Sequence, residues 1–159
     1  MQRTPRIRRA RLADLAALLA LEARFPTDRV SRTSFRRLIA RGRAEVLVCA
    51  DAGAIRGNAV VLFRARSRAA RLYSLVVHPA HRGRGVAANL LAAAEAAARR
   101  RGCESMRLEV RPDNARALGL YERRGYAVLG AVADFYEDRT PALRMHKALG
   151  HGRPAAPGR

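Results

Sequence analysis

Apolar residues in the N-terminal part of the chain recur first at strand spacing and then at helical spacing. Residues 7–10 predict a short first strand, and residues 12–23 carry leucines at the spacing of an amphipathic helix. Asp14 lies where a carboxylate favours the positive start of that helix, and Pro26 predicts its end. Ser31 can cap a second helix. Two amphipathic helices are therefore expected before any long strand.

The next segment predicts three strands in succession. Residues 45–51 are apolar enough for a buried strand, a turn forms around Gly53, and residues 55–66 are typical of its hairpin partner. Gly57 inside this second run predicts a bulge. A short loop leads to a third strand at residues 71–77. Because short connections join the three, we expect an antiparallel meander.

An arginine- and glycine-rich turn then joins the third strand to an alanine-rich helix. Residues 72–91 read LYSLVVHPAHRGRGVAANLL, and the helix is expected over residues 85–101, with Gly102 ending it. Glycines let the backbone approach an anion closely, and successive backbone N–H groups can point at it. The helix that follows presents the positive end of its dipole. This stretch predicts a phosphate cradle.

Strand alternation returns after this helix. In residues 105–110 the apolar positions share one face, so Glu109 faces the opposite way. Asp113 or Asn114 can cap a further helix that runs to about residue 124 and carries Tyr121 among its apolar positions. Final strands are expected at residues 126–132 and 142–149, joined by a polar, aromatic segment.

Length and composition fit one domain. A chain of 159 residues buries about two-thirds of its unfolded surface, and we expect residues 1–149 to form one domain followed by a mobile tail at 150–159. No apolar run reaches the roughly 18 residues needed to span a bilayer, and no signal-peptide pattern opens the chain. A cytoplasmic protein without membrane contact is expected. Cys49 and Cys103 lack metal-site spacing and are expected to be buried.

The charge balance raises a second class of function. The chain carries 32 lysines and arginines against 13 acidic residues, a formal charge of +19, and Lys147 is its one lysine. Such charge attracts nucleic acid, a ribosomal surface or acidic substrates, so a basic nucleic-acid-binding module is the alternative. Arginine is spread over every segment, however, and aromatic residues make up only 5% of the chain. This favours non-specific attraction over recognition.

Two segments carry a resemblance to a known family. The first is Arg82-Gly83-Arg84-Gly85-Val86-Ala87, preceded by a strand that ends in Val77-His78-Pro79. The second comprises residues 108–114 (LEVRPDN) and 120–126 (LYERRGY). Together they resemble the GNAT superfamily of acetyl-CoA-dependent N-acetyltransferases, and the second is most similar to bacterial ribosomal-protein N-terminal alanine acetyltransferases. The resemblance implies an α/β (α+β) three-layer fold, with a mixed, mostly antiparallel sheet of six to seven strands flanked by about four helices.

The resemblance also implies a donor site for acetyl-CoA as cosubstrate, without a metal. The backbone N–H groups of the cradle would bind the pyrophosphate, and the strand before it would pair with the pantetheine arm. The alternative is an ordinary surface turn between a strand and a helix. The implied cofactor-binding residues are Leu75, Val76, Val77, Arg82, Gly83, Arg84, Gly85, Val86, Ala87, Ala88, Asn114 and Tyr121.

Acetyl transfer to an amine needs a base and an acid beside the thioester. By resemblance Glu109 is the base, directly or through a water, and Tyr121 donates a proton to the coenzyme A thiolate. The alternatives are a strand carboxylate paired with an arginine and a tyrosine that only packs. Asn114 can contact the cofactor, cap a helix or do both.

The acceptor is left open by the sequence. A primary amine is implied, with a protein or peptide N-terminus ahead of a small-molecule amine. Similar enzymes differ in two segments, here residues 25–34 and 134–141, the second of which holds Phe135 and Tyr136. His78 and His81 lie three apart without acidic or thiol partners, so we expect them to be solvated loop residues rather than metal ligands.

Overall fold

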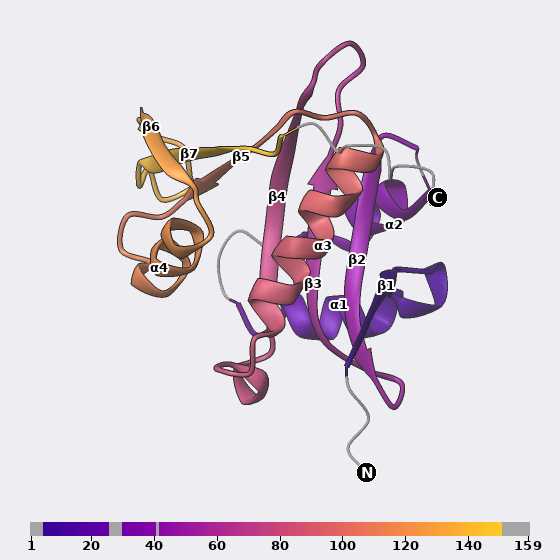
Figure 1. The fold of residues 1–159 in the computed structure, drawn as a ribbon. Coiled ribbons are helices and arrows are strands. Elements are labelled where there is room, and N and C mark those ends of the chain that lie inside the picture. The colour runs from indigo at the N-terminus through magenta and orange to yellow at the C-terminus, as the bar shows by residue number, and fades with distance from the viewer. Residues whose placement is uncertain (1–4, 26–29, 41, 151–159) are drawn as a thin grey trace.

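The computed structural model describes residues 5–25, 30–40 and 42–150. In this part of the chain seven strands form one sheet, and four α-helices pack around it (Figure 1). The strands are β1 (Arg6–Arg9), β2 (Ala44–Asp51), β3 (Ala54–Leu62), β4 (Ala69–Val77), β5 (Ser105–Val110), β6 (Ala127–Val132) and β7 (Ala142–Ala148). The helices are α1 (Leu15–Glu22), α2 (Arg32–Ala40), α3 (Val86–Arg100) and α4 (Ala115–Arg123), with 3₁₀ turns η1 (Leu12–Asp14) and η2 (Pro79–His81).

All seven strands belong to one mixed sheet in the order β1-β2-β3-β4-β5-β7-β6. Neighbouring strands run antiparallel except β4 and β5, which are parallel and are connected through α3. The antiparallel meander expected for β2, β3 and β4 is confirmed. The mixed, mostly antiparallel sheet of the predicted fold class is confirmed as well.

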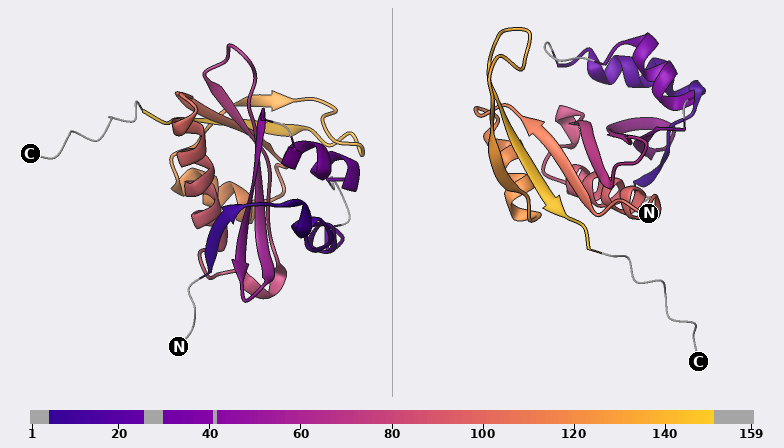
Figure 2. Two further views of the ribbon diagram at one scale, coloured as in Figure 1. Left: turned by 90° about the vertical axis from the view of Figure 1, so that its right-hand side faces the viewer. Right: turned by 90° about the horizontal axis from the view of Figure 1, so that it is seen from above.

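Helices cover both faces of the sheet and give the fold three layers (Figure 2). One core cluster joins α3 and α4 to the sheet, and its centre includes Leu90, Leu91 and Met106. A second cluster on the other face joins α1 and α2 to β2 and β3, around Leu18 and Phe35. No helix among the described residues is both long and apolar enough to cross a membrane.

The central strands β4 and β5 separate soon after they pair. Their parallel register covers only residues 69–72 of β4 and 105–108 of β5, although both strands continue. At this point β4 carries a bulge against β3, because Val60 pairs with Ser74 while Val61 pairs with Leu72. Tyr73 is the extra residue, and a bulge bends the strand that carries it. The sheet therefore opens between the distal halves of β4 and β5.

Element boundaries differ from the sequence predictions in a few places. The hairpin partner ends at Leu62 rather than at residue 66, because the chain turns at residues 64–66 and Arg66 takes a positive φ of 61°. The first helix begins as a 3₁₀ turn and ends at Glu22, with Ala23 as its C-cap, so it stops before Pro26, which lies outside the described residues. Residues 151–159 of the expected tail also lie outside them. The cap at Ser31 is confirmed, since its hydroxyl accepts from the Ser34 N–H at 3.1 Å.

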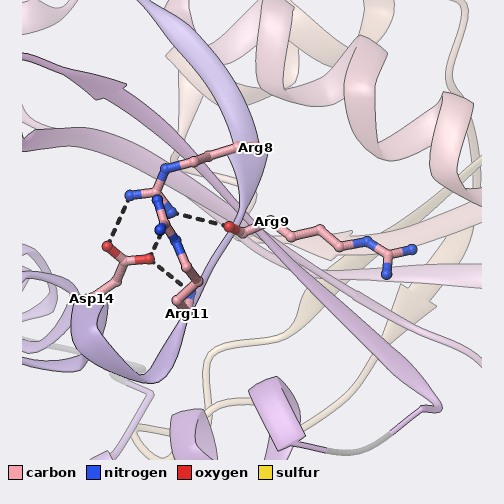
Figure 3. A network of polar contacts seen from close by, with 4 residues as sticks. All are labelled: Arg8, Arg9, Arg11 and Asp14. Atoms are coloured by element: carbon pink, nitrogen blue, oxygen red, sulfur yellow. Dashed lines mark hydrogen bonds and ion pairs between the residues drawn. The ribbon is translucent and has the colours of Figure 1, made fainter.

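A compact ion pair joins β1 to the start of the first helix (Figure 3). Both terminal nitrogens of Arg8 donate hydrogen bonds to the Asp14 carboxylate, at 2.8 and 2.9 Å. The same carboxylate accepts a hydrogen bond from the Arg11 backbone N–H at 2.7 Å. The hydrogen bond from Arg8 is the main cause that lowers the pKa of Asp14. Asp14 thus stabilises the connection between β1 and the first helix. It also lies at the start of that helix, where it was expected.

Gly57 allows close packing beneath the diverging strand. It lies on β3 opposite Val77, and the extra residue of a bulge, Arg56, is next to it, so the bulge predicted at Gly57 is confirmed one position away. A Cβ atom at Gly57 would lie 2.8 Å from the Val76 carbonyl oxygen and 3.2 Å from a Val86 methyl. The absence of a side chain at Gly57 therefore lets β4 and α3 meet here.

Gly57→Ala should destabilise the fold by about 1–3 kcal/mol, because the new methyl group must displace backbone rather than a flexible side chain. Urea unfolding measures the change, and Gly130→Ala on β6 is the control because no atom lies within 4 Å of the position of its added Cβ. Equal stability of the two variants would contradict the packing role of Gly57.

Candidate active site

A cleft of about 680 Å³ opens where β4 leaves β5. Its walls come from the end of β4, the turn before α3, the first turn of α3 and one side of α4. Phe25, after α1, also lines it. Among the residues predicted to bind the cofactor, those that line this cleft are Leu75, Val76, Val77, Arg82, Gly83, Gly85, Val86, Ala87, Ala88, Asn114 and Tyr121. Arg84 is the exception and is exposed beside the cleft.

The turn before α3 has the backbone shape of an anion cradle. Gly83 and Gly85 take φ values of 76° and 77°, in the left-handed region that favours glycine. Gly85 is the N-cap of α3, and no side chain caps this helix. The first backbone N–H groups of an α-helix have no partner within the helix. Those of Val86, Ala87 and Ala88 line the cleft, so the turn fits a pyrophosphate.

The outer edge of β4 fits an extended ligand. Residues 75–77 pair with β3 on one side only, because β5 has already separated from β4 on the other. Within the described chain this edge has no strand partner, and its backbone groups border the cleft. An extended chain carrying amide groups can hydrogen-bond to such an edge, as a further strand would. A pantetheine arm has this form, so edge and cradle together fit coenzyme A.

Tyr121 points from α4 into the apolar side of the cleft. The residue is only 7% exposed, and burial raises the pKa of its hydroxyl well above the usual range. The group is therefore a neutral phenol at physiological pH and still holds the proton that an acid catalyst must donate. Its ring meets that of Tyr126 edge-on, with centroids 5.7 Å apart.

A buried network that the sequence analysis missed supports Tyr126. The Tyr126 hydroxyl donates to Glu95 Oε2 at 3.0 Å, and Lys147 Nζ donates to Glu95 Oε1 at 2.9 Å. Glu95 is 6% exposed on α3, so its charge is paired and hydrogen-bonded as burial requires. Burial and then Glu95 raise the pKa of Tyr126. Glu95 carried a sequence signal, because it is a lone carboxylate within an alanine- and leucine-rich helix.

Glu109 lies on β5 just beyond the last residue pair with β4. Its side chain is 5% exposed and faces away from Met106, as predicted. Arg71 Nε donates to Oε2 at 3.0 Å, and Arg144 donates to Oε1 at 3.4 Å. These contacts confirm the arginine-paired carboxylate that was weighed as the alternative, and Glu109 does not line the cleft. A carboxylate oxygen holding one donor can still accept another.

Asn114 and the two histidines have defined local roles. The Asn114 side chain accepts from the Ala117 N–H at 3.1 Å and caps α4, which confirms the cap. Both histidines lie at the turn into α3 and are partly exposed, as expected of loop residues. His78 Nδ1 accepts from the Ala80 N–H at 3.1 Å, and His81 lines the cleft with its Nδ1 buried and unpartnered.

The segment between β6 and β7 is fixed to the end of β5. The Arg111 guanidinium lies 4.1 Å from the centroid of the Tyr136 ring and donates to Asp138 at 3.0 Å. That hydrogen bond, followed by those from Thr140, holds the pKa of Asp138 at about 2. The Phe135 and Tyr136 rings meet edge-on with centroids 4.9 Å apart. This segment, predicted to shape the acceptor site, is thus held beside β5.

Metal-binding clusters and reactive thiols are not features of this cleft. Residues 5–25, 30–40 and 42–150 contain no group of three or more histidine, cysteine, aspartate or glutamate side chains placed to hold a metal. Cys49 and Cys103 are buried, as predicted, and burial raises the pKa of both thiols.

The diverging strands and the glycine cradle are together typical of a transferase with an acyl-coenzyme A donor. Residues 15–126 match the model of the acetyltransferase (GNAT) family, so the chain belongs to that family and is an acetyl-CoA-dependent N-acetyltransferase. The predicted family and fold class are confirmed.

Solved structures share this fold over most of the chain. A ribosomal-protein-alanine N-acetyltransferase from Brucella melitensis is 27% identical, with a TM-score of 0.77 over 90% of this chain and 99% of that one. The ribosomal-protein-S18-alanine N-acetyltransferase from Escherichia coli is 23% identical, with a TM-score of 0.81 over 96% and 99%. A spermidine N-acetyltransferase chimera from Vibrio cholerae is 19% identical, with a TM-score of 0.80 over 92% and 96%. The fold thus serves several acceptor classes.

Proposed function

We propose that the chain transfers the acetyl group of acetyl-CoA directly to the N-terminal amine of a protein or peptide. The observation that carries the proposal is the charge around Glu109, which is flanked by Arg71 and Arg144 at the opening of the sheet. The second signature segment, residues 108–126, and the resemblance to ribosomal-protein-alanine N-acetyltransferases support the same acceptor. A cytoplasmic location, as predicted, fits this donor and acceptor.

The donor lies along β4 in this proposal. Its pyrophosphate is held by backbone N–H groups of Gly83 and of residues 85–88, and Arg82 adds a guanidinium. Its pantetheine arm pairs with residues 75–77, and a backbone N–H of this edge polarises the thioester carbonyl. Asn114 borders the arm from α4. The thioester then lies between β4 and β5, close to Tyr121.

The acceptor amine attacks the thioester carbonyl carbon in its neutral form. Glu109, directly or through a water, takes the proton that the amine gives up as the new C–N bond forms. The C–S bond breaks, and the leaving thiolate takes a proton from Tyr121. The raised pKa of Tyr121 keeps this proton in place until the thiolate appears. Arg71 and Arg144 fix the position of the Glu109 carboxylate on β5.

The same arginines discriminate between classes of acceptor. A polyamine such as spermidine carries several positive charges, and one carboxylate between two guanidinium groups leaves its surroundings positive. Like charges brought together at a binding site oppose binding. A peptide N-terminus carries a single charge, which is lost when the amine becomes neutral. The β6–β7 segment and helices α1 and α2 lie on the same side of the sheet and flank this approach (Figure 2, right).

Acetyl-CoA and a peptide with a free N-terminal alanine should release coenzyme A, and spermidine at equal concentration should give a rate at least about tenfold lower because of like-charge repulsion. Thiol release and mass spectrometry of the peptide measure the reaction. The same peptide with a blocked N-terminus is the control and should give no product. Faster acetylation of spermidine than of any free peptide would contradict the proposed acceptor.

Tyr121→Phe should lower kcat by about 10²–10⁴-fold, because the leaving thiolate loses its proton donor. Steady-state kinetics with the same peptide measure the change, and the KM for acetyl-CoA should move little. Tyr126→Phe is the matched control, because it removes a hydroxyl from the adjacent ring. That hydroxyl donates a hydrogen bond to Glu95. This substitution should lower the unfolding temperature and spare kcat. Equal loss of kcat in both variants would assign Tyr121 a packing role.

A further inference from the structure

A second cavity, of about 360 Å³, lies near the starts of β4 and β5. Leu38 from α2 and Leu62 from the end of β3 supply apolar walls. The arginines that line it come from five separate parts of the chain, and we call the cavity the arginine pocket. They are Arg37, Arg43, Arg64, Arg71 and Arg107.

The inner wall of the arginine pocket adjoins the proposed base. Arg71 lines the pocket and also donates to Glu109. Arg107 is the register partner of Arg71 on β5, so the two side chains leave the same face of the sheet as neighbours. On the other side of β5, the register partner of Arg107 is His146 on β7 and not an acidic residue. A partly buried guanidinium beside another one is unfavourable unless an anion compensates it.

The remaining arginines add to this excess of positive charge. Arg37, Arg43 and Arg64 are exposed at the pocket and come from α2, the segment before β2 and the segment after β3. Across residues 5–25, 30–40 and 42–150, these three and Arg107 form no ion pair. Arg71 is the pocket arginine that has a carboxylate partner. Four arginines without an ion pair among the described residues therefore line one cavity, and their guanidinium groups are available for bidentate contacts with an anion.

We propose that the arginine pocket binds acidic side chains that follow the N-terminus of the acceptor peptide. This inference rests on the proposed function, because it places the acceptor amine beside Glu109. An extended peptide advances about 3.3–3.6 Å per residue, so the second to fourth residues can reach groups roughly 7–14 Å from the amine. Arg71 connects the two places, because it donates to Glu109 and also lines the pocket. Guanidinium forks match carboxylates in geometry and charge.

The shape of the pocket favours a peptide over a nucleic acid. Its volume suits side chains rather than a phosphate backbone with bases, and Leu38 and Leu62 can contact the aliphatic stems of glutamates. Phe63 is the aromatic residue in its lining, and the Arg101 guanidinium already lies 4.2 Å from the centroid of that ring. Nucleic-acid sites combine cationic grooves with open aromatic faces for base stacking.

The test compares two peptides with the same free N-terminal alanine, one carrying glutamate and the other glutamine at the next three positions. The glutamate peptide should have a kcat/KM about tenfold higher at low ionic strength, and the ratio should shrink in 0.5 M salt because exposed charges are screened. Arg107→Gln and Arg37→Gln should each reduce the ratio about threefold or more. Arg37 is an exposed helix residue, so its variant keeps the test valid if Arg107→Gln fails to fold.

Arg6→Gln on β1 is the matched control, because it removes the same charge outside the pocket and should leave the ratio unchanged. Equal kcat/KM values for the two peptides in the native enzyme would overturn the inference and leave the proposed function standing. Acetylation of neither peptide would overturn both. Binding of a short single-stranded RNA that requires Arg37 and Arg107, together with equal peptide rates, would assign the pocket to nucleic acid and overturn the inference.

Discussion

The separation of β4 from β5 after a short parallel contact is the constraint on which the rest of the molecule depends. The bulge at Tyr73 bends β4, and β3 holds the strand on its other side as far as Val77. The strand cannot return to β5, so its outer edge stays without a strand partner. The turn before α3 then brings the glycine cradle to the end of this edge. Because Gly57 lacks a side chain, β4 and α3 pack closely enough to keep edge and cradle together.

Arginine takes part in most of the ion pairs among the described residues, and it is distributed unevenly. Three buried carboxylates are matched by cations: Glu45 by Arg9 and Arg101, Glu95 by Lys147, and Glu109 by Arg71 and Arg144. Such pairing offsets the cost of burying charge without adding much net stability. Where arginines gather without carboxylates, the surface is ready for an anion. The arginine pocket is one such place, and the cradle is the other.

The sequence was sufficient for the order of elements and for most of the residues that line the cleft, because both depend on local patterns. The signals involved affect only residues a few positions away in the sequence. They are the glycines at 83 and 85, the alternation in residues 105–110 and the capping residue Asn114. The two arginines on Glu109 come from strands that are distant in sequence, so only the sheet register brings them together. The Tyr126–Glu95–Lys147 network depends in the same way on tertiary packing. The burial of His81 Nδ1 beside the cleft could not be predicted, because a loop position gives no sign of which ring atom faces the protein.

The central claim is that the cradle beside the diverging strands holds the acyl donor through its backbone. Calorimetric titration of acetyl-CoA into Gly85→Ala and Gly53→Ala tests it most directly, because these glycines have similar φ values of 77° and 82° and open space around an added Cβ. Both variants carry the same backbone strain, about 1 kcal/mol or more, but Gly53 lies in the turn between β2 and β3. Acetyl-CoA should bind Gly85→Ala at least about tenfold more weakly, which corresponds to the loss of roughly one charge-assisted hydrogen bond, and it should bind Gly53→Ala with native affinity. Equal affinities in the two variants would contradict backbone binding of the donor at the cradle.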